Sequence, residues 1–311
     1  MSRFPSPPPP GMAEGTAHLI PRSDIDIQDS LGQGGYGEVF SGLRKGGSRV
    51  AVKRLLQGLT AKSKSEFKRE VAVLSAMACE FVVQLYGVVD DSPDQPVLIV
   101  MELMHESLFD AVHKSDTPPS LRQRIMWLVQ AGKGIAFLHA KGVIHRDIKP
   151  GNMLITSPDT GRRLKMGDFG LSKSLADITS SSTRSTAPGA RAAGNAGTVH
   201  YMAPELFKMK PEYSPASDVY AFGFVSWEII CRKLPYKECS DPQLIKEGVR
   251  AGEREDFASD FPPALKAMIE RAWGQVNPPT LKSYFFYAFV GAGPQAAPVH
   301  RRVRARPGAV P

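Results

Sequence analysis

The chain has 311 residues, of which 42% are hydrophobic and 23% charged, values that exclude a wholly disordered protein. The length favours one soluble domain of two lobes with tails over two independent domains. Part of the net charge of +8 comes from four arginines close to the C-terminus. The body of the chain is therefore only mildly basic, and no specific nucleic-acid partner is expected. These arginines are Arg301, Arg302, Arg304 and Arg306.

The cysteines and the N-terminus indicate a reducing compartment. Cys79, Cys231 and Cys239 show neither CxxC spacing nor a histidine pattern, so we expect no zinc site and no disulfide framework. The N-terminus lacks the apolar stretch of a signal peptide, and no run is long enough to span a bilayer. We expect a cytoplasmic or nuclear protein without a membrane span.

The first third of the chain predicts a small sheet with one helix. Residues 1–23 are proline-rich and are expected to be disordered. Ser65 to Met77 has a helical pattern. Four short runs rich in β-branched residues predict strands: Glu38 to Phe40, Arg49 to Lys53, Val82 to Val89 and Val97 to Met101.

After Ser107 the pattern becomes helical, with helices expected over Leu121 to Lys141, Ser217 to Cys231 and Ala264 to Trp273. Thr179 to Gly197 predicts a long loop. The fold class is α+β, with a β-rich lobe followed by an α-rich lobe. We expect one domain over residues 24–279, divided into lobes 24–104 and 105–279, and then an atypical, disordered basic tail over 280–311.

A glycine-rich stretch in the β-rich lobe predicts a phosphate-binding loop, because glycines let backbone amides approach phosphate oxygens. A hairpin turn without a ligand and a dinucleotide-binding turn are alternatives. Lys53 on the following strand could reach under such a loop, whereas the dinucleotide interpretation requires a helix directly after the glycines. The stretch consists of Gly32, Gln33, Gly34, Gly35, Tyr36 and Gly37.

Glu70 lies on the predicted helix after Lys53 and could pair with its ammonium group. The alternative is a solvated helix face, since Glu66, Lys68 and Arg69 are neighbours.

Four later motifs decide between these interpretations. His145-Arg146-Asp147-Ile148-Lys149-Pro150-Gly151-Asn152 is followed by Asp168-Phe169-Gly170, and then by Ala203-Pro204-Glu205 and Asp218 to Gly223. With them the chain resembles the eukaryotic protein kinase family over Leu31 to about Trp273. The sequence around Trp227-Glu228 is similar to that of the tyrosine-kinase-like group of serine/threonine kinases.

The resemblance implies transfer of the ATP γ-phosphate to a protein hydroxyl with Mg²⁺ as cofactor. Asp147 would orient the hydroxyl and Lys149 would neutralise the γ-phosphate, while Asn152 and Asp168 would hold the metal. Lys53 and Glu70 would position the other phosphates. The remaining ATP-binding residues implied are Leu31 and the glycine-rich stretch, with Val39, Ala51, Glu102, Met104 and Leu154 around adenine.

The resemblance also bears on the acceptor and on supporting roles. A lysine at position 149 accompanies serine/threonine specificity in the family, with tyrosine-directed or dual specificity as the alternative. His145 and Phe169 are expected to pack with Leu74 and Leu85, and Asp218 to anchor the catalytic loop. Arg146 could bind a phosphate on the loop that follows Asp168, added by an upstream kinase or by autophosphorylation. The candidate acceptors are Ser180, Ser181, Ser182, Thr183, Ser185 and Thr186.

The chain departs from the family pattern after Trp273. No arginine stands where a partner for a buried Glu205 is expected, and a buried carboxylate without its partner is costly. A pseudokinase scaffold without transfer activity is therefore an alternative function. A polyanion-binding module built on the basic tail is a second one.

Overall fold

The structure is a computed structural model that describes residues 18–34, 37–55, 71, 74–75, 78–90, 95–168, 196–209, 211 and 213–274. The chain divides into two compact units. The first comprises Met1–Ala78, Gln84–Leu103 and Leu171–Arg184, and the second Cys79–Val83, Met104–Gly170 and Ser185–Pro311. The first contains a sheet and the second is mainly helical, which confirms the predicted fold class.

The first unit contains an antiparallel sheet with strand order β1-β2-β3-β5-β4. The four predicted strands are confirmed, but β1 was missed because its sequence, IDIQDSLGQG, is mostly polar. The strands are β1 (Ile25–Gly34), β2 (Gly37–Arg44), β3 (Ser48–Leu55), β4 (Leu85–Val89) and β5 (Leu98–Glu102). Of the predicted helix Ser65–Met77, only Val71, Leu74 and Ser75 are described, and they are helical.

Strand β3 lies in the middle of this sheet and is buried on both faces. Val50 and Val52 belong to one core cluster, and Ala51 and Lys53 alternate with them on the opposite face. Because both faces are covered, the register of β3 decides which side each of its residues reaches.

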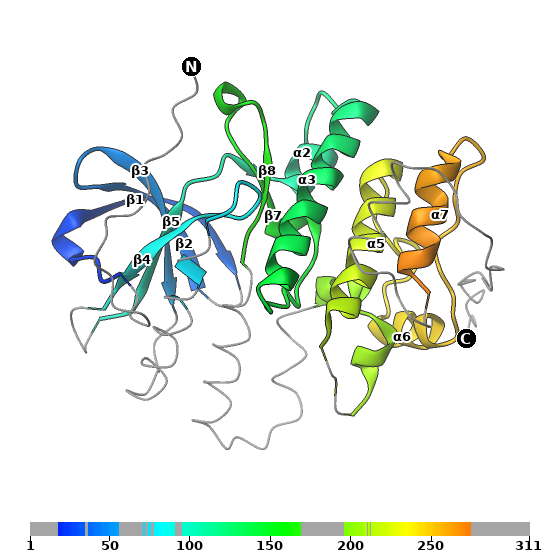
Figure 1. The fold of residues 1–311 in the computed structure, drawn as a ribbon. Helices are drawn as coiled ribbons and strands as arrows, with labels where there is room; N and C mark the ends of the chain where they lie inside the picture. Colours follow the sequence, from blue (N-terminus) through cyan, green and yellow to red (C-terminus); the bar gives the residue numbers. More distant parts are fainter. Residues whose placement is uncertain are drawn as a thin grey trace, which may run out of the picture. The chain divides into compact units, whose positions relative to one another are not determined.

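The second unit is built around helix α5 (Pro215–Cys231), in which every residue from Ser217 to Ile230 is buried. Helices α3 (Leu121–Ala140) and α7 (Pro263–Ala272) pack against it (Figure 1). These three helices confirm the sequence prediction, whereas α2 (Leu108–His113) and α6 (Pro242–Arg250) were not predicted.

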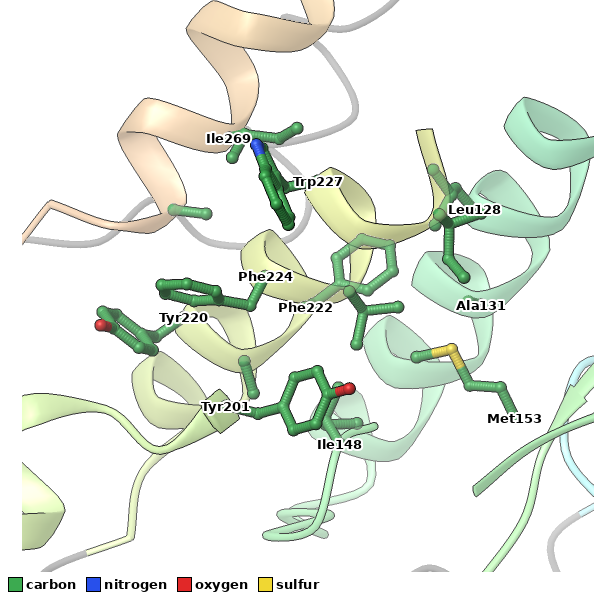
Figure 2. Close-up of a cluster of buried hydrophobic side chains, with 14 of the residues drawn as sticks. Leu128, Ala131, Ile148, Met153, Tyr201, Tyr220, Phe222, Phe224, Trp227 and Ile269 are labelled. Atoms are coloured by element: carbon green, nitrogen blue, oxygen red, sulfur yellow. The ribbon is translucent and has the colours of Figure 1, made fainter. Parts of the chain in front are cut away.

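Helix α5 begins at a capping box, in which the Ser214 hydroxyl accepts from the Ser217 amide and the Ser217 hydroxyl accepts from the Ser214 amide. Its aromatic side chains fill the core of the unit (Figure 2). The rings of Phe224 and Trp273, for example, have their centroids 4.7 Å apart. This packing makes α5 the rigid support for the loops around it.

A small sheet in the same unit brings the segment before β7 close to the segment after β8. Strands β6 (Glu106–Ser107), β7 (Met153–Ile155) and β8 (Leu164–Met166) pair in that order. Met153 of β7 lies opposite Met166 of β8. The residues just outside this pair, Asn152 and Gly167, therefore emerge at the same end of the hairpin.

The three cysteines are free thiols. None of the helices in the described ranges is both long enough and apolar enough to span a membrane.

Candidate active site

The glycine-rich stretch forms the hairpin between β1 and β2, where Gly34 lies opposite Gly37. A strand, not a helix, follows the glycines, so the dinucleotide-binding interpretation is wrong. Gly37 packs so closely on the next strand that a Cβ would collide with the Arg54 carbonyl oxygen. Leu31, Gly32 and Gln33 are exposed. Gly35 and Tyr36 lie outside the described residues.

Lys53 is fixed by strand pairing. It lies opposite Val39 on β2 and Ile99 on β5, and only 5% of its surface is exposed. A buried ammonium requires an anionic or hydrogen-bonding environment. Its predicted partner, Glu70, lies outside the described residues.

The predicted adenine-binding residues fall in both units. In the sheet, Ala51 is buried and pairs with Met101, and partly exposed Val39 lies on the neighbouring strand. Glu102 ends β5 and is tied to Gln84, whose carbonyl accepts from the Glu102 amide at 2.9 Å. In the helical unit, Leu154 lies on β7 and Met104 precedes β6; both are partly buried.

The two carboxylate oxygens of Asp147 differ, because one has hydrogen-bond donors and the other has none in the described part of the chain. Oδ2 accepts from Lys149 Nζ at 2.8 Å and from Asn152 Nδ2 at 2.9 Å. Oδ1 is buried and accepts no hydrogen bond from the residues that the structure describes. Buried acceptors normally have a donor, so Oδ1 is an exception among the buried polar atoms of this loop.

The buried carboxylate of Asp218 on α5 supports this loop from beneath. Its Oδ1 accepts from the Arg146 amide at 2.8 Å, and its Oδ2 accepts from the His145 amide at the same distance. His139 Nε2, in the last turn of α3, contacts Oδ2 at 2.8 Å. These bonds hold Arg146 at a φ of 70°, a left-handed conformation that is costly for arginine. The predicted anchoring role of Asp218 is confirmed.

His139 was missed by sequence reasoning. It lies six residues before His145, and its only sequence signal is its place at the end of a predicted helix.

His145 links the catalytic loop to the segment after β8. Its buried imidazole donates from Nε2 to the Gly167 carbonyl at 2.9 Å, and Nδ1 accepts from the Asp147 amide at 3.4 Å. The ring therefore ties the backbone of the catalytic loop to the segment after β8. Phe169, its predicted packing partner, is outside the described residues.

Asn152 and Asp168 are brought to the same end of the β7–β8 hairpin. The Gly167 amide donates to the Asn152 carbonyl at 2.8 Å, and Asp168 follows with a φ of 53°. Amide and carboxylate oxygens are the hard ligands that Mg²⁺ prefers, so these residues fit the implied metal. In the described part of the chain, no group of three His, Cys, Asp or Glu side chains could hold a metal ion. Bound Mg²⁺ commonly keeps waters and phosphate oxygens as ligands.

Glu205 is less buried than expected from the sequence. It lies on η5 (Pro204–Phe207) and is only partly buried, so water supplies part of its solvation. The buried guanidinium of Arg254 and Glu205 both act electrostatically on Tyr220. The penalty for lacking the usual arginine is therefore smaller than for a fully buried carboxylate.

The candidate phosphate-binding arginine, Arg146, places its guanidinium carbon 5.8 Å from the centre of the Tyr213 ring. Its Nε is buried without a hydrogen-bond partner within the described ranges. The six candidate phosphorylation sites between 180 and 186 fall outside the described residues.

A glycine hairpin, a buried lysine on the next strand and an anchored aspartate loop define the class of protein kinase domains. Residues 25–279 match the family model for protein tyrosine and serine/threonine kinases, and the chain belongs to this family.

Similar proteins include kinases named for either kind of acceptor. The chain is 31% identical to the insulin receptor of Xenopus laevis over 278 residues, covering 83% of this chain and 19% of the receptor. It is 30% identical over 254 residues to a probable serine/threonine-protein kinase of Dictyostelium discoideum, covering 82% of this chain and 17% of that protein. The human insulin receptor-related protein is 31% identical over 278 residues, with 83% and 20% covered. The chain thus spans a fifth or less of these relatives.

Proposed function

We propose that the chain is an active protein kinase that transfers the γ-phosphate of ATP to serine or threonine hydroxyls of protein substrates. The observation that carries the proposal is the asymmetry of Asp147, whose Oδ2 is held by Lys149 and Asn152 while Oδ1 has no donor among the described residues. A carboxylate fixed in this way is prepared to accept a hydroxyl proton.

Each site residue has a task in this mechanism. Asp147 Oδ1 orients the acceptor hydroxyl and takes its proton as the oxygen attacks phosphorus. Lys149, 2.8 Å from Asp147, contributes positive charge beside the attacked phosphoryl group. Lys53 holds the other phosphates, together with Glu70. ATP would supply the phosphoryl group, and Asn152 and Asp168 would hold Mg²⁺, whose charge would offset that of the phosphate oxygens.

Serine or threonine specificity is supported by Lys149. Its ammonium group bonds the same carboxylate that receives the hydroxyl, and the kinase family has a lysine here in its serine/threonine members. The Dictyostelium relative is named as a serine/threonine kinase, but the insulin receptor is equally similar. The acceptor therefore has to be measured.

Activation by phosphorylation of the loop after Asp168 belongs to the same proposal. Arg146 follows His145 directly, and its backbone is fixed by Asp218. A phosphate bound by this guanidinium would be tied to the catalytic loop itself. Alanine at all six candidate positions should lower activity, and unchanged activity would contradict this part.

The test is incubation of the purified chain with labelled ATP, Mg²⁺ and a generic basic protein, followed by mass spectrometry of the modified residues. We expect phosphoserine or phosphothreonine, and loss of transfer in the Asp168→Asn variant. No transfer by the folded wild-type chain would favour a pseudokinase scaffold, and phosphotyrosine alone would refute the proposed specificity. Binding to RNA or heparin that disappears without residues 300–311 would favour the polyanion-binding alternative.

A further inference from the structure

Helix α5 contains a second buried carboxylate, Glu228, which the mechanism above does not use. Its exposed fraction is 0%, and both of its oxygens are occupied. Tyr201 donates its hydroxyl to Oε2 at 2.7 Å, and His113 Nε2 contacts Oε1 at 2.9 Å. A carboxylate withdrawn from water depends on such partners, so these three side chains form one unit.

Tyr201 connects this unit to the surroundings of the catalytic loop. It is the last residue of η4 (Ala196–Tyr201), and its ring lies in the same buried cluster as Ile148, which follows Asp147 (Figure 2). Burial, and then the charge of Glu228, raise the pKa of the Tyr201 phenol well above its ordinary value. The phenol therefore stays protonated and keeps donating to Glu228.

His113 decides how the Glu228 carboxylate is turned. It is the last residue of α2, its ring lies 5.0 Å from that of Phe109, and 14% of its side chain is exposed. Because His113 occupies Oε1, Oε2 is left directed at Tyr201. Asp218 and Glu228 stand ten residues apart on α5, or about 15 Å along the helix axis. One carboxylate of α5 thus holds the catalytic loop and the other holds η4.

We propose that His113 is a positioning residue for the protein substrate, acting through Glu228 and Tyr201 to fix η4 beside the catalytic loop. The protein substrate in this inference follows from the proposed kinase function. Its geometry follows from the two hydrogen bonds of Glu228. A protein hydroxyl has to reach Asp147 in this loop, and Tyr201, the last residue of η4, shares a buried cluster with Ile148 next to Asp147. Because His113 acts through Glu228 and Tyr201, its loss should affect binding of the protein and not of ATP.

Two substitutions of His113 distinguish the effect of its hydrogen bond to Glu228 from the effect of the size of its ring. The amide nitrogen of glutamine reaches about as far as Nε2 of histidine, whereas that of asparagine reaches only to the Nδ1 position. His113→Gln should therefore keep the bond to Glu228, and His113→Asn should lose it. Thermal melting of both variants provides the folding control.

The experiment measures KM for a basic protein substrate and for ATP, and hydrogen exchange of the peptide covering residues 196–206. For His113→Asn we expect the protein KM to rise about fivefold or more, the ATP KM to stay within about twofold, and exchange in 196–206 to accelerate. His113→Gln should restore both readouts. The peptide covering residues 143–153, held by Asp218, should exchange as in the wild type.

Equal KM values and equal exchange in the wild type and His113→Asn would overturn the inference, as would parallel changes for ATP and protein. If the wild-type chain transfers no phosphate, the proposed function fails by itself. The exchange rate of 196–206 then still decides whether His113 holds η4.

Discussion

The two units fix their chemical groups in different ways. In the sheet, Lys53 is placed by backbone pairing with β2 and β5, which continues along whole strands. In the helical unit, the catalytic loop has little regular structure and is held by side chains, with Asp218 accepting from two loop amides and contacting His139. Placement by pairing is spread over many bonds, whereas placement by one carboxylate depends on a single residue. Substitutions should therefore have very different consequences in the two units.

The largest effect is expected for Asp218→Ala. It leaves the amides of His145 and Arg146 and the ring of His139 without their buried acceptor. The free energy of unfolding should fall by about 3 to 5 kcal/mol, as measured by urea denaturation. Asp159→Ala, at an exposed position of the short 3-10 helix Pro158–Thr160, is the matched control and should change it by less than about 0.5 kcal/mol. Equal effects of the two substitutions would contradict the dependence on Asp218.

A smaller effect is expected for Val52→Ala on β3. Val52 is fully buried on the face opposite Lys53, so truncation should cost about 2 kcal/mol of unfolding free energy. Because backbone pairing sets the position of Lys53, the KM for ATP should remain within about twofold of the wild type. A folded variant that no longer uses ATP would show that side-chain packing, and not register, places the lysine.

The smallest expected effect concerns the reactivity of Cys231, at the end of α5, and leaves stability unchanged. Burial raises the pKa of this thiol to about 11, against a reference value of 9.0. Burial disfavours the thiolate, so at pH 8 the reactive thiolate should be about 100-fold scarcer than for an ordinary cysteine.

The rate of alkylation by iodoacetamide in a Cys79→Ser, Cys239→Ser variant measures the thiolate fraction. Slow alkylation that accelerates as pH rises would agree with tight packing of α5 to its last residue. A rate near that of a free thiol would mean that this end of the helix is open.

The same contrast explains what sequence could predict. The glycine hairpin, Lys53 and the catalytic loop are short local patterns, so their residues could be named without coordinates. Asp218 could be assigned its role only through the family resemblance. Strand β1 was missed because its residues are polar, and α2 because six residues are too few to show a period.

Contacts between residues far apart along the chain left no signal. His113 and Glu228 are separated by 115 positions, and nothing in either local sequence pairs them. The burial of Glu205 was overestimated for the same reason, since exposure depends on what packs around η5. His139 resembles any histidine near a helix end until its bond to Asp218 is seen.

The most direct test of the account is the single-turnover rate of phosphoryl transfer by the Asp147→Asn variant. Asparagine keeps the shape of the side chain but cannot take the proton that Asp147 accepts in the proposed mechanism. We expect the rate to fall by about 10² to 10⁴ relative to the wild type, with ATP affinity and melting temperature retained. A rate within about threefold of the wild type would contradict the role of Asp147.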